Sequence, residues 1–301
     1  MADIPFDKNL ALRPGEVDEP APGVRRVMAD NGGPFTFKGT ISCIVGRGKV
    51  AIIDPGPLDQ RHVDALLQAV RGETVTHIFV THTHNDHSPA VRALKAATGA
   101  TVYAEGPHRA SRDLHDGDIV RPADRDFRPD IVVKDGDVVQ GDGWSLQGVA
   151  TPGHTANHMA FALRGTDILF SGDHVMGWSS TIVAPPDGSM YDYITSLEKL
   201  MKRSETTYFP GHGPAIRDAA RFSALLLDHR KARERSIFAV LSKGASTVAG
   251  IAAESYRSLD ERLIGAARMT VLAHLEDMVR RKLVETDGPP TLEAAYRVSR
   301  T

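Results

Sequence analysis

The stretch VTHTHNDHSPA, residues 80–90, places three histidines and one aspartate within six positions. Side chains crowded in this way repel one another when charged, and they cost free energy when they are buried without partners. A polyvalent cation among them removes both costs, because imidazole nitrogens and carboxylate oxygens are ligands of divalent metals. The stretch therefore predicts a metal site, and further ligands are expected elsewhere in the chain.

Composition limits the class of protein around this stretch. The chain has 301 residues with 41% hydrophobic residues, 36 Lys and Arg against 38 Asp and Glu, and a net charge of −2. No overall attraction to nucleic acid or to an anionic membrane follows from this balance. Cys43 is the single cysteine, which excludes an intrachain disulfide and fits a reducing compartment.

The ends and apolar runs of the chain bear on its location. The N-terminal segment is acidic and rich in proline, unlike a signal peptide. No apolar run approaches the roughly 18 residues that a membrane span needs. We expect a cytoplasmic protein with no membrane partner, and the sequence does not determine its oligomeric state.

Strand-like and helix-like segments alternate over most of the chain. Strands are expected within 35–55, at 77–80 and in four later apolar runs that each begin or end at a Gly, His or Asp turn, and helices at 61–70, 88–99 and 190–203. This alternation indicates an α/β core of about 220 residues. A long helix is expected after Pro214.

The pattern changes near residue 236. Three helices are expected at 236–244, 246–256 and 264–285, followed by a small hairpin around Asp287–Gly288. Three helices before a two-stranded wing are typical of a winged helix-turn-helix. We therefore predict an N-terminal extension at 1–30, a catalytic domain at 31–232 and a winged-helix-like domain at 233–301.

The spacing of the first motif indicates two metal positions. His82 and His84 lie two residues apart, so in a tight loop both can face one point. Asp86 and His87 must face elsewhere, because one loop cannot direct four large side chains at one tetrahedral centre. Three later loops, each after an apolar run, supply further candidate ligands: His154 in TPGHT, Asp173 in FSGDH and His212 in FPGHG.

HTHNDH resembles the H-x-H-x-D-H signature of the metallo-β-lactamase superfamily, and TPGHT, SGDH and PGHG resemble its later metal-binding loops in the same order. Glyoxalase II and RNase Z share this set. The resemblance implies a four-layer αββα sandwich with its site at one edge of the two sheets. It also implies one metal held by His82, His84 and His154, a second held by Asp86, His87 and His212, and Asp173 as a bridge.

Longer stretches resemble a narrower group, the β-lactamase-like protein 2 proteins. The resemblance lies in IIDPGP, SGDHVMG, YDYITSLEKL, HRKARERSI and AHLEDMVRRKLV, and a winged-helix-like segment follows the metal domain in that group too. Two departures stand near the expected pocket mouth. GTISC replaces the group's usual Asn-Thr-Tyr run, and Thr83 and Asn85 stand where bulky or basic residues are usual. The substrate therefore cannot be transferred from the relatives.

The ligand set predicts a mechanism. Two divalent cations about 3.5–4 Å apart can share a hydroxide that attacks an acyl centre at neutral pH. Asp86 is expected to be catalytic as well as a ligand, because it could orient the hydroxide and move its proton. The donors suit zinc best, with iron and manganese as alternatives. Asp54 has two interpretations: an acceptor that fixes a ligand histidine, or a turn residue bonded to local backbone.

Other polar residues near the motifs have weaker signals. His174 either contacts the site or is an ordinary loop histidine. Tyr191 and Tyr193 either overhang the pocket or pack a helix, with packing favoured. His77 and His158 are assigned to strands or their flanks.

Three functions are compatible with these residues. The first is hydrolysis of a small ester, thioester, lactone or amide, and the second is cleavage of single-stranded RNA. From residue 221 onward there are 14 Lys and Arg against 10 Asp and Glu, which is only mildly basic, and we interpret RKARER (230–235) as a solvated helix face. The third is a winged-helix regulator, which the scarcity of Arg, Lys and Asn in the second helix disfavours. Hydrolysis of β-lactams is disfavoured by the expected location.

Overall fold

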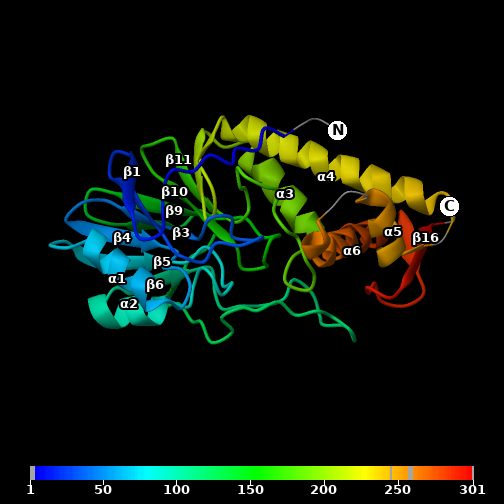
Figure 1. The fold of residues 1–301 in the computed structure, drawn as a ribbon, viewed down its shortest axis with the longest axis horizontal. Helices are drawn as coiled ribbons and strands as arrows, with labels where there is room; N and C mark the ends of the chain where they lie inside the picture. Colours follow the sequence, from blue (N-terminus) through cyan, green and yellow to red (C-terminus); the bar gives the residue numbers. More distant parts are fainter. Residues whose placement is uncertain (1–3, 245, 257–259, 300–301) are drawn as a thin grey trace.

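Two β-sheets packed face to face form the centre of the molecule, as the computed structural model shows for residues 4–244, 246–256 and 260–299 (Figure 1). The seven-stranded sheet runs in chain order through β1 (Val17–Ala21), β2 (Val24–Met28), β3 (Ile41–Val45), β4 (Lys49–Ile53), β5 (Thr74–Phe79), β6 (Thr101–Ala104) and β7 (Ile131–Val132). The six-stranded sheet has the order β13 (Ile216–Arg217), β12 (Thr207–Pro210), β11 (Ile168–Gly172), β10 (Met159–Leu163), β9 (Ser145–Ala150) and β8 (Val138–Gln140).

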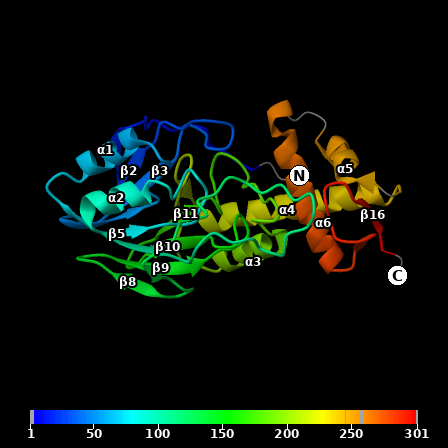
Figure 2. The same cartoon turned by 90° about the horizontal axis from the view of Figure 1, so that it is seen from below.

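Helices cover the outer face of each sheet. The first sheet carries α1 (Gln60–Ala69) and α2 (Val91–Thr98), and the second carries α3 (Met190–Leu200) and α4 (Ala219–Leu241). The predicted four-layer αββα arrangement is therefore confirmed (Figures 1 and 2).

The central strands are apolar on both faces because one face packs against the other sheet and the opposite face packs against helices. In β10, Phe161 and Leu163 point into the core between the sheets, whereas Ala160 and Ala162 face the helical layer. A strand directs successive side chains to opposite faces, so large residues fill one interface and small ones let a helix approach. The ring centroids of Phe79 and Phe161 lie 5.0 Å apart across the two sheets. Burial at both interfaces holds the strand ends, and the loops after them, in fixed positions.

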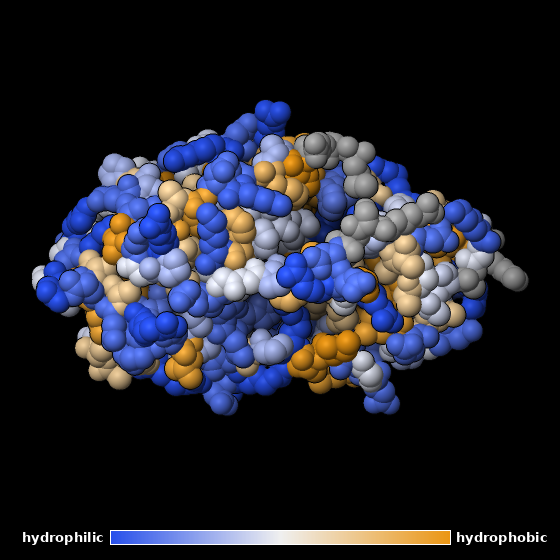
Figure 3. All heavy atoms as spheres, viewed as in Figure 1, coloured by the Kyte–Doolittle hydropathy of each residue, from blue (hydrophilic) through white to orange (hydrophobic). Residues whose placement is uncertain are grey.

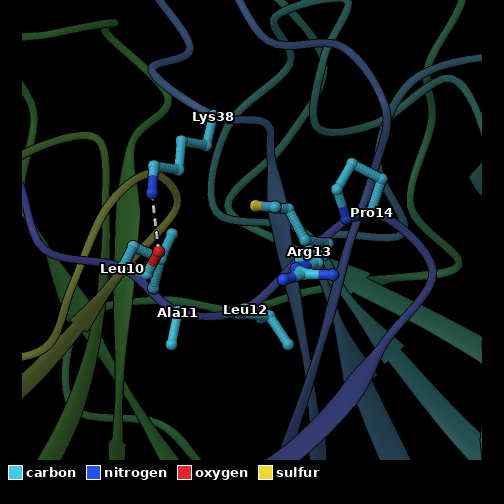
Figure 4. A pocket seen from close by; sticks show the side chains of 7 residues that line it. Leu10, Ala11, Leu12, Arg13, Pro14 and Lys38 are labelled. Atoms are coloured by element: carbon cyan, nitrogen blue, oxygen red, sulfur yellow. Dashed lines mark hydrogen bonds between the residues drawn. The ribbon is translucent and has the colours of Figure 1, made fainter.

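The N-terminal segment belongs to the sheet. Residues 17–28 form β1 and β2, and the side chains of Leu10 and Leu12 lie in the core, so the prediction of an extension over residues 1–30 is wrong for this part. A turn at Gly23 separates the two strands, and this signal was too short to recognise in the sequence. A cavity of about 560 Å³ lies beside this segment, and the Lys38 ammonium donates to the Leu10 carbonyl at 2.7 Å. Figure 4 shows the side chains that line this cavity. None of the predicted metal ligands lines it.

The C-terminal elements extend from the end of α4. The first of the three predicted helices is wrong as a separate element, because residues 236–241 continue α4 without a break. The other two are present as α5 (Val248–Ser255) and α6 (Ile264–Arg280), with the short 3-10 helix η1 (Glu261–Leu263) before α6. The predicted hairpin is confirmed as β15 (Val284–Thr286) and β16 (Ala295–Val298), with β14 (Ser246–Thr247) as a third strand.

The predicted domain division at 232/233 falls inside α4, the long yellow helix of Figure 1, which spans both parts. The division and the winged-helix assignment remain predictions. Figure 3 shows a face that is mostly hydrophilic with separate apolar patches. Among the helices that the structure describes, none is both long enough and apolar enough to cross a membrane.

Candidate metal centre

Loops at the ends of several strands bring the predicted ligands together. The segment 80–90 follows β5, and His154 lies between β9 and β10. Asp173 follows β11 and His212 follows β12. Three groups of these side chains have ligand atoms within 4.8 Å of one another: His82, His84 and His154; His82, His87 and Asp173; and Asp86, His87 and His212. All seven predicted ligands therefore belong to one constellation.

Three imidazoles form the first group. The His84 Nδ1 atom lies 3.1 Å from His82 Nε2 and 3.0 Å from His154 Nε2. Zinc–nitrogen bonds of 2.0–2.1 Å in a tetrahedron separate donor atoms by about 3.3 Å. The spacing is thus close to that of three nitrogens around one tetrahedral ion.

The second group combines carboxylates and imidazoles, and we define it as Asp86, His87, Asp173 and His212. The His212 Nε2 atom lies 3.1 Å from Asp86 Oδ2 and 3.3 Å from Asp173 Oδ2. The His87 Nε2 atom lies 3.4 Å from Asp86 Oδ2 and 3.5 Å from Asp173 Oδ1. Asp173 also faces the first group, because its Oδ2 atom lies 3.8 Å from His154 Nε2. One carboxylate therefore stands between two sets of donors.

Buried polar atoms test whether these residues suit metal ions. Three atoms at the centre are shielded from solvent and have no hydrogen-bond partner among the described residues: Nε2 of His87 and of His212, and Oδ1 of Asp173. Buried polar atoms are nearly always satisfied, so unpaired atoms of this density need a ligand. Imidazole nitrogens and carboxylate oxygens together match borderline divalent cations such as zinc.

The two groups differ in charge. Burial alone would lower the pKa of His87, but the carboxylates of Asp86, Asp173 and Asp54 raise it well above its usual value. Burial is likewise outweighed at His212, where Asp173 and Asp86 raise the pKa to about 9. Burial would raise the pKa values of Asp86 and Asp173, yet the neighbouring His87 and His212 bring both well below the ordinary range. Without a metal, this group is a network of charged pairs.

The first group is neutral at pH 7. Burial lowers the pKa of His82 well below its usual value, and the neighbouring histidines add to the effect. Burial, His84 and Arg121 lower the pKa of His154 to about 3, although Asp173 opposes the shift. Burial and Arg121 also lower the pKa of His84. Three neutral imidazoles with nitrogens in contact are ready to donate lone pairs to a cation.

Acceptors outside the constellation orient the rings. His87 Nδ1 lies 2.9 Å from Asp54 Oδ2, His154 Nδ1 lies 2.7 Å from the Ile182 carbonyl, and His212 Nδ1 lies 3.3 Å from the Gly39 carbonyl. Such partners fix which nitrogen carries the proton, so that the other nitrogen is free to bind a metal.

The Asp54 carboxylate contacts a predicted ligand histidine, and the backbone amide that it bonds belongs to Thr81, 27 positions away, rather than to the local backbone of the second interpretation. Its carboxylate faces His87, and it also accepts from the Thr81 amide and the Thr81 hydroxyl, each at 2.7 Å. Its φ of 51° lies in the left-handed region, which Asp adopts more readily than most residues. The turn that follows β4 thus presents a buried carboxylate to the loop that follows β5.

Sequence reasoning did not find Asp187 and His108. The buried Asp187 carboxylate lies 3.9 Å from His84 Nε2 and 3.4 Å from His108 Nε2. His108 Nδ1 lies 3.0 Å from the Thr83 hydroxyl, so a small residue inside the first motif has a defined partner. Both residues lie in irregular segments without a sequence motif, so the sequence carries no signal for either, and the burial of Asp187 is seen only in the structure.

A glycine allows the close approach of two ligands. A Cβ atom on Gly211 would lie 2.6 Å from His87 Cε1 and 2.7 Å from Asp173 Oδ1. Contacts this short do not occur, so a side chain at 211 would displace one of the two. The PGHG turn therefore shapes the site as well as supplying His212.

The remaining predicted residues lie beside the constellation. His174 is buried, neither of its ring nitrogens has a hydrogen-bond partner among the described residues, and its ring lies 4.6 Å from that of Tyr193. Tyr193 packs in the core, as expected, whereas Tyr191 is 47% exposed and lies under the Arg280 guanidinium at 3.6 Å. The structure therefore places the ring of Tyr191 against Arg280 of α6. His158 immediately precedes β10, where its Nε2 accepts from the Asp173 amide at 3.2 Å; His77 lies in β5.

The interpretation of RKARER as a solvated face is wrong for two of its residues. Arg230 is 2% and Arg233 is 8% exposed. They lie three positions apart on α4, so both point to the same side of the helix. Each guanidinium donates to a backbone carbonyl, Arg230 to that of Thr181 and Arg233 to that of Ser255.

Known proteins resemble this chain in sequence and in fold. The sequence profile described as the metallo-beta-lactamase superfamily matches residues 36–212. The chain is 31% identical to a beta-lactamase-like protein 2 homolog of Caenorhabditis elegans, over 75% of this chain and 74% of that one. It is 29% identical to an atrochrysone carboxyl ACP thioesterase of Paecilomyces divaricatus, over 94% and 85%. The crystal structure of a beta-lactamase domain protein from Burkholderia ambifaria shares the fold, with a TM-score of 0.79, 20% identity and coverage of 97% and 96%.

Proposed function

The chain belongs to the metallo-beta-lactamase superfamily of hydrolases, and on this premise we propose that it cleaves acyl thioesters or related small acyl compounds with two bound divalent metal ions. The observation that carries the proposal is the pair of adjacent ligand groups that share Asp173. Zinc is the metal we propose, with iron and manganese accepted by the same donors.

The proposed ligands divide as the two groups do. His82, His84 and His154 would hold one ion through three neutral nitrogens, and Asp86, His87 and His212 would hold the other. Asp173 would contact both. Ions bound there supply Lewis acidity toward the acyl oxygen and a water molecule acidified to a pKa of about 7.

Asp86 is the residue that we propose as catalytic. Its side chain is 26% exposed, whereas those of Asp173 and Asp54 are 8% and 3% exposed. Asp86 is therefore the carboxylate of the three through which a proton can pass between the site and the solvent. Its Oδ2 atom, 3.1 Å from His212 Nε2, is placed to orient a nucleophile and to carry its proton toward the leaving group.

A thioester is the preferred acyl compound within this class. The relative named as an ACP thioesterase aligns with 94% of the chain. Cleavage of RNA gains no support, because two arginines counted in the mildly basic C-terminal part are buried and cannot contact a phosphate backbone. The regulator is disfavoured too, since residues 248–255 of α5 contain no Arg or Lys.

The test uses purified protein with its metal content measured. Turnover of acyl-pantetheine thioesters, matched oxoesters, a lactone, an amide and single-stranded RNA is followed before chelation, after chelation and after zinc is restored. We expect chelator-sensitive turnover that is fastest with a thioester. His82→Ala and Asp173→Ala should lose turnover and most of the metal, while His77→Gln, which alters a histidine within β5, should retain both. Turnover by metal-free Asp173→Ala protein would refute the mechanism.

A further inference from the structure

Arg230 lies in the interior, and no carboxylate of the part of the chain that the structure describes pairs with it. The residue belongs to α4, beyond the segment 36–212 that the superfamily profile matches, and it is 2% exposed. Within the described ranges no ion pair to Arg230 is present, and its Nε atom has no hydrogen-bond partner. A buried and unpaired guanidinium is unfavourable unless the surrounding groups compensate for it. Its contacts therefore indicate what it does.

Those contacts lead to the metal centre. Arg230 Nη2 donates to the carbonyl of Thr181, and the guanidinium lies 5.0 Å from the centroid of the Tyr193 ring. The Thr181 hydroxyl is placed to donate to the carbonyls of Asp173 and His174, at 2.8 Å and 3.0 Å.

The next residue along the chain reaches the other ligand group. The Ile182 carbonyl accepts from His154 Nδ1 at 2.7 Å. Residues 181 and 182 thus contact the backbone of the shared carboxylate ligand and the ring of a first-group ligand. A shift of this segment would move Asp173 and rotate His154 together.

We propose that Arg230 is a positioning residue for the metal centre: from α4 it fixes the 181–182 segment, and through it the geometry of Asp173 and His154. The proposal rests on the proposed function, because it requires metal ions at these ligands. Outer groups of this kind typically change metal affinity or activity by 10- to 100-fold. Arginine suits the role, since its planar fork loses less rotamer freedom per hydrogen bond than a lysine ammonium does.

Arg233 provides a matched control on the same helix. It is also buried, donates to the carbonyl of Ser255 at 2.7 Å, and its guanidinium lies 3.9 Å from the centroid of the Tyr256 ring. Arg230→Met and Arg233→Met each remove a buried guanidinium that bonds one carbonyl and covers one aromatic ring. The partners differ, because those of Arg233 belong to the end of α5.

The experiment measures Zn²⁺ affinity by chelator competition and the visible absorption of the Co²⁺-substituted protein, with thermal stability recorded alongside. We expect both Met variants to lose stability, but only Arg230→Met to bind metal roughly 10- to 100-fold more weakly and to change the Co²⁺ spectrum. Arg230→Lys should recover part of the affinity. If Arg230→Met does not fold, Thr181→Val removes the hydroxyl that contacts Asp173 while keeping the carbonyl, and it should change the same two readouts.

The outcomes separate this inference from the proposed function. A wild-type protein that binds no metal overturns the proposed function and this inference with it. A wild-type protein that binds metal, together with a folded Arg230→Met or Thr181→Val protein of unchanged affinity and spectrum, overturns the inference alone. Equal losses of metal affinity in Arg230→Met and Arg233→Met would also overturn it, because the effect of Arg230 on metal binding would then be one of general stability.

Discussion

Replacing Asp54 by Asn tests the second ligand group with a change of one atom. Asn is nearly isosteric with Asp and tolerates the left-handed φ of 51°, so the turn itself is retained. The Asp54 carboxylate now accepts from the Thr81 amide, the Thr81 hydroxyl and His87 Nδ1, at 2.7, 2.7 and 2.9 Å. An amide offers one accepting oxygen. If that oxygen stays on the Thr81 amide, the NH₂ group faces His87.

The consequence for His87 is a change of tautomer. A donor at position 54 requires Nδ1 to accept, which moves the ring proton to Nε2, the atom that faces Asp86 and Asp173. A protonated Nε2 cannot bind a metal. Loss of an outer partner costs 10- to 100-fold in metal affinity, or about 1.4–2.8 kcal/mol. Within the described part of the chain, none of His82, His84 and His154 is hydrogen-bonded to Asp54: His82 Nδ1 lies 3.0 Å from the Thr81 hydroxyl, and His154 Nδ1 lies 2.7 Å from the Ile182 carbonyl. Only one of two metal ions should therefore bind more weakly.

The assay is a titration of metal-free protein with Zn²⁺ against a competing chelator, with the stoichiometry determined separately. We expect one site of wild-type affinity and one site weakened 10- to 100-fold. Asp118→Asn is the control, because this buried carboxylate accepts from Arg112 and from the His115 amide and contacts no proposed ligand. Two sites of unchanged affinity in folded Asp54→Asn protein would refute the argument.

Three further predictions follow from the geometry and the charges. Gly211→Ala should weaken the second metal ion at least 10-fold and cost about 1–3 kcal/mol, as measured by metal titration and urea unfolding, because the added methyl displaces His87 or Asp173. Binding of Zn²⁺ at pH 7 should release protons, because His212, with a pKa of about 9, must lose one, whereas His154, with a pKa of about 3, has none to lose. Calorimetry in buffers of different ionisation enthalpy counts the released protons, and a binding reaction that releases none would contradict the charge assignment. Burial raises the pKa of Glu276 from 4.5 to about 7 despite Arg112. Between pH 4.5 and 7 the unfolded chain therefore loses a proton that the folded chain keeps, and wild-type stability should fall by up to about 3 kcal/mol relative to Glu276→Gln across this window, as checked by unfolding at several pH values.

Most of the ligand set could be predicted because its signals are local. HTHNDH holds four candidates in six residues, and each later ligand follows an apolar strand that ends in a glycine-containing turn. The alternation of strands and helices indicated an α/β core, whereas the four-layer arrangement was implied by the resemblance to the superfamily. These features depend on short windows of sequence, within which spacing and polarity decide the structure.

The supporting residues could not be predicted because their partners are distant in the chain. Asp187 is 103 positions from His84, and Arg230 is 49 positions from Thr181. Neither has a pattern of its own, and a run such as RKARER has the composition of an exposed helix face whichever residues turn inward. β1 and β2 were missed for a related reason, since strands of five residues gain their stability from pairing with neighbours.

The burial of Arg230 bears on how the two halves of the molecule depend on each other. The ligands arise within the segment that the superfamily profile matches, but the 181–182 segment beside them is bonded to a helix outside it. Since α4 continues into the C-terminal elements and packs against α5, its position depends on both parts of the chain. A protein cut after His212 would keep every proposed ligand and lose a contact that positions two of them. The C-terminal elements are thus structurally coupled to the metal centre through α4, whatever additional role they have.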